Sequence, residues 1–204
     1  LDALGADTDG YAVERVEIRR ALGHALLALR EFESSREQFE LAREECEPRT
    51  ELAALVPQVL CDLGQLEREL GDDLAALDRL RRSLDLELSL AEPSIERIEH
   101  VRFYLGSTLE RVGELDEAEA LLTQATQSRL ARLGCGSAPA LSAAMVLARI
   151  HQAQGKYELA AAECDEAIRC AKGELAPDNR TWLTMQVAYS VALQHAGRWG
   201  EARD

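Results

Sequence analysis

Four glycines recur at a fixed interval along this sequence. Gly71, Gly113, Gly155 and Gly197 are 42 residues apart in each case, and an alanine follows each of them five positions later. A fixed period of this length is typical of a repeat array, in which one supersecondary unit stacks on the next. The chain is therefore expected to consist of about five similar units and not of one globular core.

The residues around each glycine have a helical spacing. Residues four and eight positions before it are mostly apolar and fall on one helical stripe. A small residue stands seven positions before each glycine, and before Arg30 at the equivalent place in the first copy: Gly23, Gly64, Gly106, Ala148 and Ser190. Further core positions follow nine and twelve residues after it. Because glycine inside a helix costs about 1 kcal/mol relative to alanine, each glycine is predicted to be a turn between two amphipathic helices.

This pattern resembles the tetratricopeptide repeat. Its signs are the small residue, the glycine, a bulky residue two positions later (Leu115, Tyr157 and Trp199) and the alanine after five positions. The interval exceeds the usual length of about 34 residues and resembles the longer repeats of kinesin light chains and bacterial signalling proteins. It would also suit HEAT or armadillo repeats, but the glycine and alanine offsets favour the tetratricopeptide interpretation. The resemblance implies an all-α fold, a right-handed α-solenoid of about five antiparallel helix pairs.

The expected organisation is a lead-in over residues 1–10 and one solenoid over 11–204. The repeats are placed at about 11–50, 51–92, 93–136, 137–177 and 178–204, the last of them incomplete. The first copy is the loosest match, because Arg30 replaces the turn glycine and Ser35 the following alanine. Pro57 lies in the first turns of the first helix of repeat two and predicts either a late start or a kink of that helix. The predicted N-caps of repeats three, four and five are Ser94, Ser137 and Asp178.

Charge and composition exclude several classes of protein. The net charge is −14 and the pI is near 4.8, which argues against nucleic acid or an anionic membrane as partner. No apolar run approaches the roughly 18 residues of a membrane span. The five cysteines are an odd number without framework spacing and favour a reducing compartment, so a cytoplasmic location is expected. Lys156 and Lys172 are the sole lysines, a bias that suggests a bacterial source.

The two ends of the sequence suggest a segment of a larger protein. The chain does not begin with methionine, and Asp204 follows the glycine at 197 by seven residues. The last repeat would then lack its complete second helix and would leave Leu193 at an exposed core edge. We therefore expect weak end-to-end self-association of the chain.

Neither catalysis, a metal nor a cofactor is expected from the motifs. Asp72, Asp73 and Asp78 suit a helix start better than a metal site. Gly134-Cys-Gly136 follows a helix and is predicted to be a turn, not a dinucleotide fingerprint. Cys164 and Cys170 lie on different helical faces, so they do not form a zinc pair, and Cys164 is predicted to fill the core. The four histidines lie in four different repeats.

The resemblance implies that the first helices of the repeats line a concave groove that takes peptides. Positions 13, 10, 6 and 3 before each glycine share one helical stripe. The residues predicted to bind there are Arg20, His24, Gln65, Arg68, Phe103, Ser107, Arg111, Met145, Arg149 and Gln152. Arginines beside exposed apolar residues favour a protein or peptide ligand with acidic and apolar side chains. Another interpretation stays open, that Met145, Val187 and Val191 pack between adjacent first helices.

Three functions follow from these features. The leading hypothesis is a non-catalytic scaffold that binds proteins or peptides within a larger bacterial signalling or regulatory protein. The second is a signal-peptide sensor that controls an attached effector domain. The third, an all-helical enzyme, would need a catalytic role for Asp72 and Asp73.

Overall fold

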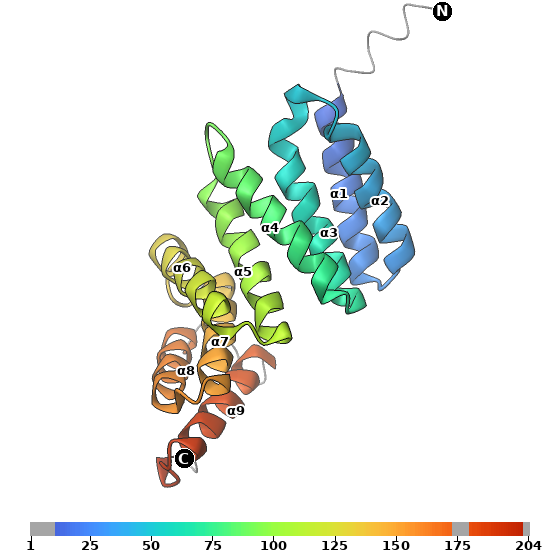
Figure 1. Cartoon of the computed structure of the whole chain (residues 1–204). Helices are drawn as coiled ribbons and strands as arrows, with labels where there is room; N and C mark the ends of the chain where they lie inside the picture. The colour runs from blue at the N-terminus through green and yellow to red at the C-terminus, as the bar shows by residue number, and fades with distance from the viewer. Residues whose placement is uncertain (1–10, 173–179, 202–204) are drawn as a thin grey trace, which may run out of the picture. The chain divides into compact units, whose positions relative to one another are not determined.

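The computed structural model describes residues 11–172 and 180–201, and within these ranges the chain is built of α-helices (Figure 1). In chain order they are α1 (Ala12–Ala28), α2 (Phe32–Cys46), α3 (Val56–Leu70), α4 (Asp73–Ser89), α5 (Ile95–Val112), α6 (Leu115–Leu133), α7 (Ala138–Ala153), α8 (Tyr157–Ala171) and α9 (Arg180–His195). A short 3-10 helix, η2 (Thr50–Leu55), precedes α3. The all-α prediction is confirmed. The lead-in at 1–10 and the cap at Asp178 lie outside the described residues.

The helices form two compact units, residues 1–108 and 109–204, whose boundary falls within α5. In the first unit, α1 packs on α2, α2 on α3 and α3 on α4. In the second unit, α6, α7, α8 and α9 pack on one another in chain order. Consecutive helices thus pair across short turns, as expected for a helical repeat. None of the helices in the described part of the chain is long and apolar enough to cross a bilayer.

The turn glycines adopt the left-handed backbone conformation that the period predicts. Gly71, Gly113, Gly155 and Gly197 have φ values of 84°, 88°, 76° and 79°. The next residue donates its backbone N–H to the carbonyl five positions earlier, which closes the helix end. These bonds are Glu31 to Leu26, Asp72 to Glu67, Glu114 to Leu109, Lys156 to His151 and Arg198 to Leu193. Arg30 has a φ of 63°, so the first repeat makes the same turn without glycine.

The small residues allow the two helices of a repeat to cross closely. Ala76, Ala118 and Ala160, the alanines five positions after the turn glycines, are fully buried. Ser35, which stands at the same position of the first repeat, is also buried, and its hydroxyl donates to the carbonyl oxygen of Gly23 at 2.8 Å. The hydrogen bond satisfies the extra polar atom, which explains why serine can replace alanine there.

The helix starts agree in position with the sequence, and one of the predicted caps lacks its side-chain hydrogen bond. The short helix η2 precedes Val56, and Pro57 lies in the first turn of α3. Of the two alternatives for Pro57, the late helix start is therefore confirmed. The side chains of Ser94 and Asp72 accept backbone N–H groups of Arg97 at 3.4 Å and Ala75 at 3.1 Å, as caps do. Ser137 occupies the N-cap position of α7, as predicted, but its side chain makes no capping hydrogen bond. Its hydroxyl instead donates to the carbonyl oxygen of Gly134 at 2.9 Å, inside the turn that precedes α7.

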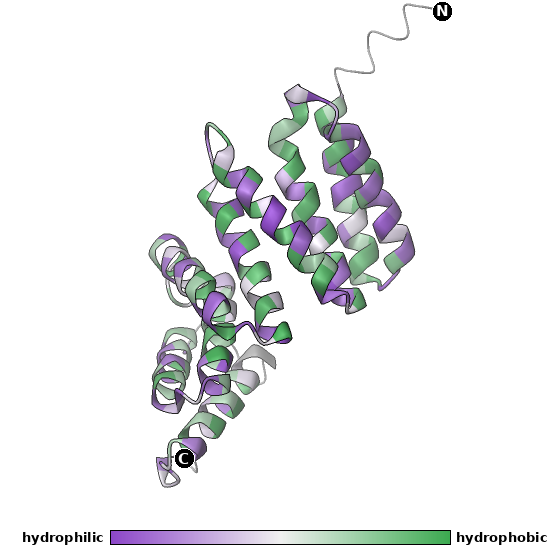
Figure 2. Cartoon of the chain, viewed as in Figure 1, coloured by the Kyte–Doolittle hydropathy of each residue, from purple (hydrophilic) through white to green (hydrophobic). Residues whose placement is uncertain are grey.

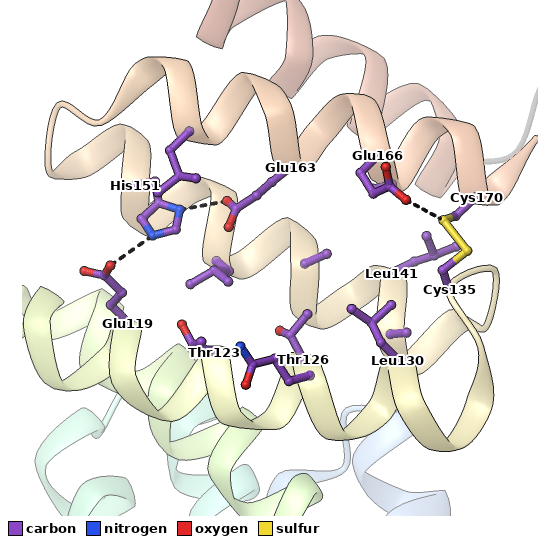
Figure 3. A pocket seen from close by; sticks show the side chains of 16 residues that line it. Glu119, Thr123, Thr126, Leu130, Cys135, Leu141, His151, Glu163, Glu166 and Cys170 are labelled. Atoms are coloured by element: carbon purple, nitrogen blue, oxygen red, sulfur yellow. Dashed lines mark hydrogen bonds and ion pairs between the residues drawn. A yellow bond between two sulfur atoms is a disulfide. The ribbon is translucent and has the colours of Figure 1, made fainter.

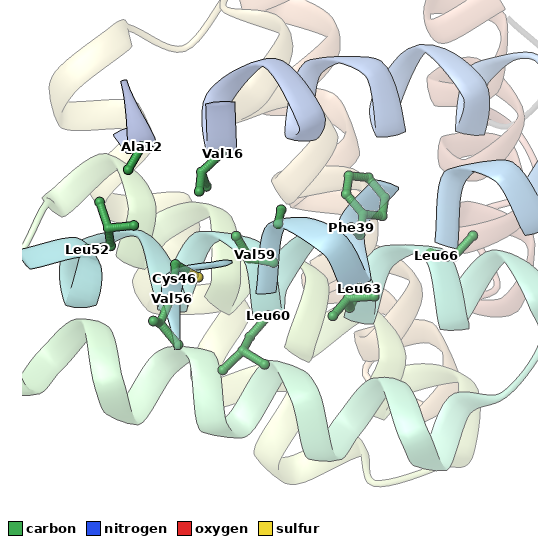
Figure 4. Close-up of a cluster of buried hydrophobic side chains, with 11 residues drawn as sticks. Ala12, Val16, Phe39, Cys46, Leu52, Val56, Val59, Leu60, Leu63 and Leu66 are labelled. Carbon is green, nitrogen blue, oxygen red and sulfur yellow. The ribbon is translucent and has the colours of Figure 1, made fainter. Parts of the chain in front are cut away.

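Each unit has its own apolar core. The core of the first unit gathers side chains of α1, α2, η2 and α3 around Phe39 (Figure 4). The second unit contains two smaller, alanine-rich clusters, and the predicted core role of Cys164 is confirmed. Leu193 is fully buried with Ala148 and Ala160, so its predicted place at an exposed edge is wrong. Self-association stays a prediction. Figure 2 shows hydrophobic and hydrophilic residues interspersed along the helices, as in amphipathic helices.

One pair of cysteines contradicts the sequence analysis. Cys135, in the turn after α6, forms a disulfide with Cys170 near the end of α8, and their Cα atoms are 5.4 Å apart. Cys46, Cys61 and Cys164 are buried free thiols. The spacing of five cysteines did not reveal this pair, and its presence removes the argument for a reducing compartment.

Candidate functional site

Three first helices meet around one cavity in the first unit. Its volume is about 330 Å³, and α1, α3 and α5 all contribute to its lining. The lining residues are His24, Leu27, Ala28, Gln65, Arg68, Glu69 and Tyr104. The structure therefore brings together three residues of the predicted groove, His24, Gln65 and Arg68.

The polar groups of this cavity are held by neighbouring side chains. The Arg68 guanidinium carbon lies 5.6 Å from the centre of the Tyr104 ring, a cation–π distance. His24 Nε2 lies 2.9 Å from Asp62 Oδ1. Gln65 Nε2 lies 3.2 Å from His100 Nε2. The cavity thus combines an oriented arginine, a histidine and an aromatic face.

Arg20 does not line this cavity, although it shares the carboxylate of Asp62 with His24. Its Nε donates to Asp62 Oδ2 at 2.6 Å and its Nη1 to Gln58 at 2.6 Å. Burial opposes the charge, but the hydrogen bond and charge of the buried Asp62 raise the pKa of Arg20 above its ordinary value. Arg20 lines a different cavity of about 230 Å³, together with Glu87 and Arg97. Its position indicates that it connects α1 to α3.

Two further predicted residues lie together in the second unit. Arg149 and Gln152 of α7 line a cavity of about 390 Å³ with Val191 and His195 of α9. Arg149 donates to both carboxylate oxygens of Glu110, from Nε at 2.8 Å and from Nη2 at 2.5 Å. This hydrogen bond outweighs burial and raises the pKa of Arg149. The charge that was predicted to receive an acidic ligand is thus already compensated by the protein.

The remaining predicted residues differ in exposure. Ser107 and Met145 are buried, so neither offers a side chain to a ligand there. Met145 packs with Leu141 and Met185, which confirms the alternative interpretation for this residue. Val187 is 64% exposed and Val191 37%, so the interpretation that they pack between adjacent first helices is wrong for these two residues. Phe103 is half-buried with its ring 5.3 Å from that of Tyr104, and Arg111 is exposed.

Sequence reasoning missed Tyr104, which lies nine positions before the turn glycine and outside the chosen stripe. It also missed the stacked pair Tyr157 and His195, whose ring centres are 4.9 Å apart beside the second-unit groove. Tyr157 is the bulky residue two positions after Gly155, which the sequence pattern uses as a sign of the repeat and not as a groove position. The signal that could have found these residues is their aromatic character beside positions assigned to the groove.

A fourth cavity, lined mainly by second helices, lies outside the groove that the hypothesis considered. It occupies about 390 Å³ between α6 and α8 in the second unit (Figure 3). His151 lies at one end, 2.7 Å from Glu163 and 3.2 Å from Glu119. The Cys135–Cys170 disulfide lies at the other end. Among the described residues, no group of three or more His, Cys, Asp or Glu side chains could hold a metal ion.

No protein-family model matches the sequence, and no curated protein matches it. Several solved structures resemble it. BtubC (BKLC) from P. vanneervenii is 13% identical, with a TM-score of 0.79 over 95% of this chain and 85% of that one. A putative kinesin light chain from Podospora anserina with nearly identical TPR-like repeats is 18% identical, with a TM-score of 0.74 over 93% of this chain and 90% of that one.

A Rap conjugation gene regulator of the plasmid pLS20, solved in complex with a peptide, is also similar. It is 15% identical, with a TM-score of 0.67 over 97% of this chain and 53% of that one, so this chain spans about half of that regulator. At such identities the likeness shows the fold. The chain has the fold of tetratricopeptide-like repeat proteins, as the resemblance of its turn glycines and alanines predicted.

Proposed function

We propose that this chain, which shares its fold with tetratricopeptide-like repeat proteins, is a non-catalytic module that binds a protein or peptide along its first helices. The observation that carries the proposal is the cavity formed by α1, α3 and α5 in the first unit. A surface built from three consecutive helices suits an extended ligand, since each helix supplies one part of the contact.

The ligand that fits this cavity combines an acidic and an apolar side chain. The guanidinium of Arg68 lies against Tyr104 and can form two hydrogen bonds to one carboxylate. Leu27 and the Tyr104 ring supply apolar surface beside it. Aromatic and arginine side chains are also the residues that most often dominate binding at interfaces. The residues proposed to contact the ligand here are therefore His24, Leu27, Gln65, Arg68 and Tyr104.

The second-unit groove is proposed to contribute less to recognition of an acidic residue. A ligand carboxylate would have to displace Glu110 from Arg149 before it could pair with that arginine. The exposed Val187 and the half-exposed Val191 instead favour apolar contact on α9. The acidic residue of the ligand is thus expected to bind the first unit.

The test is a peptide selected from a random library on the wild-type protein and then titrated by fluorescence anisotropy. Arg68→Gln should weaken binding about tenfold, and the affinity of the wild type should fall with added salt. Tyr104→Ala should weaken binding with little change in salt dependence. Arg82→Gln, an exposed arginine of α4, is the matched control and should leave affinity unchanged. Equal affinity of the Arg68 variant and the wild type would contradict the proposal.

A second function, a signal-peptide sensor, is favoured by one observation. The similar Rap regulator was solved with a bound peptide and is about twice as long as the part that matches this chain. A sensor would need an effector domain outside the 204 residues of this sequence. Hydrogen exchange of the helices with and without the selected peptide distinguishes the two functions. A sensor should show changed protection in helices that do not contact the peptide, whereas a scaffold should not.

A further inference from the structure

The cavity between α6 and α8 has the form of a ligand site. Its walls come from α6 and α8 and its floor from α7, as Figure 3 shows, and none of its lining residues lines the grooves of the first helices. Its volume of about 390 Å³ lies within the range of roughly 300–1,000 Å³ that small-molecule sites occupy. The site is thus independent of the proposed peptide groove.

The middle of the cavity is apolar. Leu130, Leu141, Leu147 and Leu159 line it together with the small side chains of Ala140, Ala144 and Ala167. Leu130 and Leu159 are 39% and 46% exposed, so each leaves apolar surface open to solvent at the rim. This surface would favour an apolar body that removes it from water.

One wall residue lacks a hydrogen-bond partner. Thr126 lines the cavity and is 7% exposed, and its hydroxyl has no partner among the described residues. Figure 3 shows the Thr126 side chain on α6, directed toward the space between the helices. A buried hydroxyl without a partner costs free energy, which a polar group of a ligand could recover.

The polar end of the cavity carries an excess of negative charge. Glu119 and Glu163 line this end together with His151, the one lining side chain that can become a cation. Glu166 lies at the opposite end, beside the disulfide, and pairs with Arg169. Lys156 donates to Glu119 from outside the lining, at 2.7 Å and 2.9 Å. Among the described residues, the carboxylate of Glu163 forms a hydrogen bond with His151, and a carboxylate has about four acceptor positions. Glu163 therefore keeps acceptor capacity toward the cavity.

The environment of Glu163 makes a cationic partner favourable. Burial raises the pKa of Glu163 above its ordinary value, and the hydrogen bond from His151 offsets this only in part. A partly desolvated carboxylate gains more from an added cation than one in water does. An anionic ligand would instead meet repulsion from the carboxylate of Glu163.

We propose that this cavity binds a small organic amine, whose ammonium group pairs with Glu163 and whose apolar body lies between Leu130, Leu141 and Leu159. The charge at one end and the apolar surface in the middle select for both parts of such a molecule. The Cys135–Cys170 disulfide closes the opposite end and fixes the turn after α6 to α8.

The test compares three indole ligands of similar size by calorimetry with the oxidised protein: tryptamine, tryptophol and indolepropionate. Tryptamine should bind saturably, whereas tryptophol, which is neutral, and indolepropionate, which is anionic, should bind at least about tenfold more weakly. Hexylamine serves as a second amine with an aliphatic body. Equal affinity for the three indole ligands, or no saturation by either amine, would overturn the proposal.

The variants locate the binding site. Glu163→Gln should weaken tryptamine binding about tenfold, the loss expected for one charge-assisted hydrogen bond. Glu158→Gln is the matched control, because this carboxylate lies on the same helix, is exposed and does not line the cavity. Ala144→Leu should fill the cavity and abolish binding in a protein that still unfolds cooperatively. Equal losses for the variants at 158 and 163, or none at 163, would contradict the site.

The two proposals fail independently. Arg68→Gln lies in the first unit and should leave tryptamine affinity unchanged. Glu163→Gln should likewise leave binding of the selected peptide unchanged.

Discussion

The ring of Phe39 packs directly on Gly23, so that a Cβ at position 23 would lie 2.7 Å from Cδ1 and 2.8 Å from Cζ of that ring. Both residues are buried where α1 crosses α2. The position thus requires glycine because of the space taken by its neighbour, and its backbone conformation is that of an ordinary helix.

Gly23→Ala should therefore destabilise the first unit. Phe39 is confined by the surrounding core, so the added methyl group should lower the free energy of unfolding by about 1–3 kcal/mol through overpacking. Denaturant unfolding measures the change. Gly200→Ala is the control, since a Cβ there would meet nothing within 4 Å. Similar losses for both variants would show that the crossing is looser than the structure indicates.

Arg30→Gly should stabilise the protein. Arg30 holds a φ of 63° in the turn where the other repeats have glycine, a conformation that costs a residue with a side chain about 1 kcal/mol or more. Arg30→Ala keeps that cost and also loses the contact of the guanidinium with the Phe32 ring at 5.4 Å. Thermal unfolding should therefore rank the glycine variant above the wild type and the alanine variant below it. A glycine variant that melts below the wild type would indicate that the Phe32 contact outweighs the backbone cost.

Ala160→Leu should destabilise the second unit by about 1–3 kcal/mol, because Ala160 is fully buried between α7, α8 and α9. Glu158→Leu, two residues earlier on the exposed face of α8, should change the free energy of unfolding little. Chemical denaturation of both variants checks the helix register. Equal shifts would mean that the two positions do not lie on opposite faces.

Reduction of the disulfide should weaken the second unit. The bond between Cys135 and Cys170 closes a loop of 35 residues, which in the chain-entropy model stabilises the folded state by about 4 kcal/mol. The melting temperature should therefore fall when a reductant is added to the wild type. Cys135→Ser should melt at the lower temperature with and without the reductant. A melting temperature of the wild type that does not respond to reductant would contradict this prediction.

Stability should fall at acid pH partly because of Glu119. The hydrogen bond from Lys156 and, to a smaller extent, the one from Gln154 lower the pKa of Glu119 to about 2 from its ordinary value of 4.5. Its ionised form thus stabilises the fold fully above about pH 4.5, and this contribution is lost as the pH falls toward 2. Glu119→Gln should flatten the loss in that window. Glu163→Gln should act at higher pH, above about 4.5. Burial raises the pKa of Glu163, so the wild type gains stability as the pH falls through that raised pKa, and the variant should lack this gain. Urea midpoints measured from neutral pH down to about pH 2 test both signs.

The fold could be predicted because its requirements recur in every repeat. Gly71 and its equivalents are needed for a positive φ, and Ala76 and its equivalents for a close helix crossing. Both are local constraints that leave a residue type in the sequence. Arg30 lies 41 residues before Gly71, one short of the period, but the small residue Gly23 seven positions earlier still allowed the first repeat to be aligned.

The site was predicted less well because groove positions depend on neighbours in adjacent repeats. Arg149 was expected to face a ligand, but Glu110 reaches it from the preceding repeat. The two residues lie on the same stripe, so a comparison of charges between adjacent repeats could have revealed the pair. Met145 could not be placed from its own helix, since its burial depends on Leu141 and on Met185 of α9.

The disulfide has a mechanical consequence. Its loop of 35 residues contains all of α7 and nearly all of α8, so a force applied to the two ends of the chain passes through the sulfur–sulfur bond. In a single-molecule extension experiment the oxidised chain should release about 120 Å less contour length than the reduced chain, at roughly 3.5 Å per residue. Under tension, these two helices would stay unloaded while the flanking helices unravel, and the cavity would lose the wall that α6 supplies.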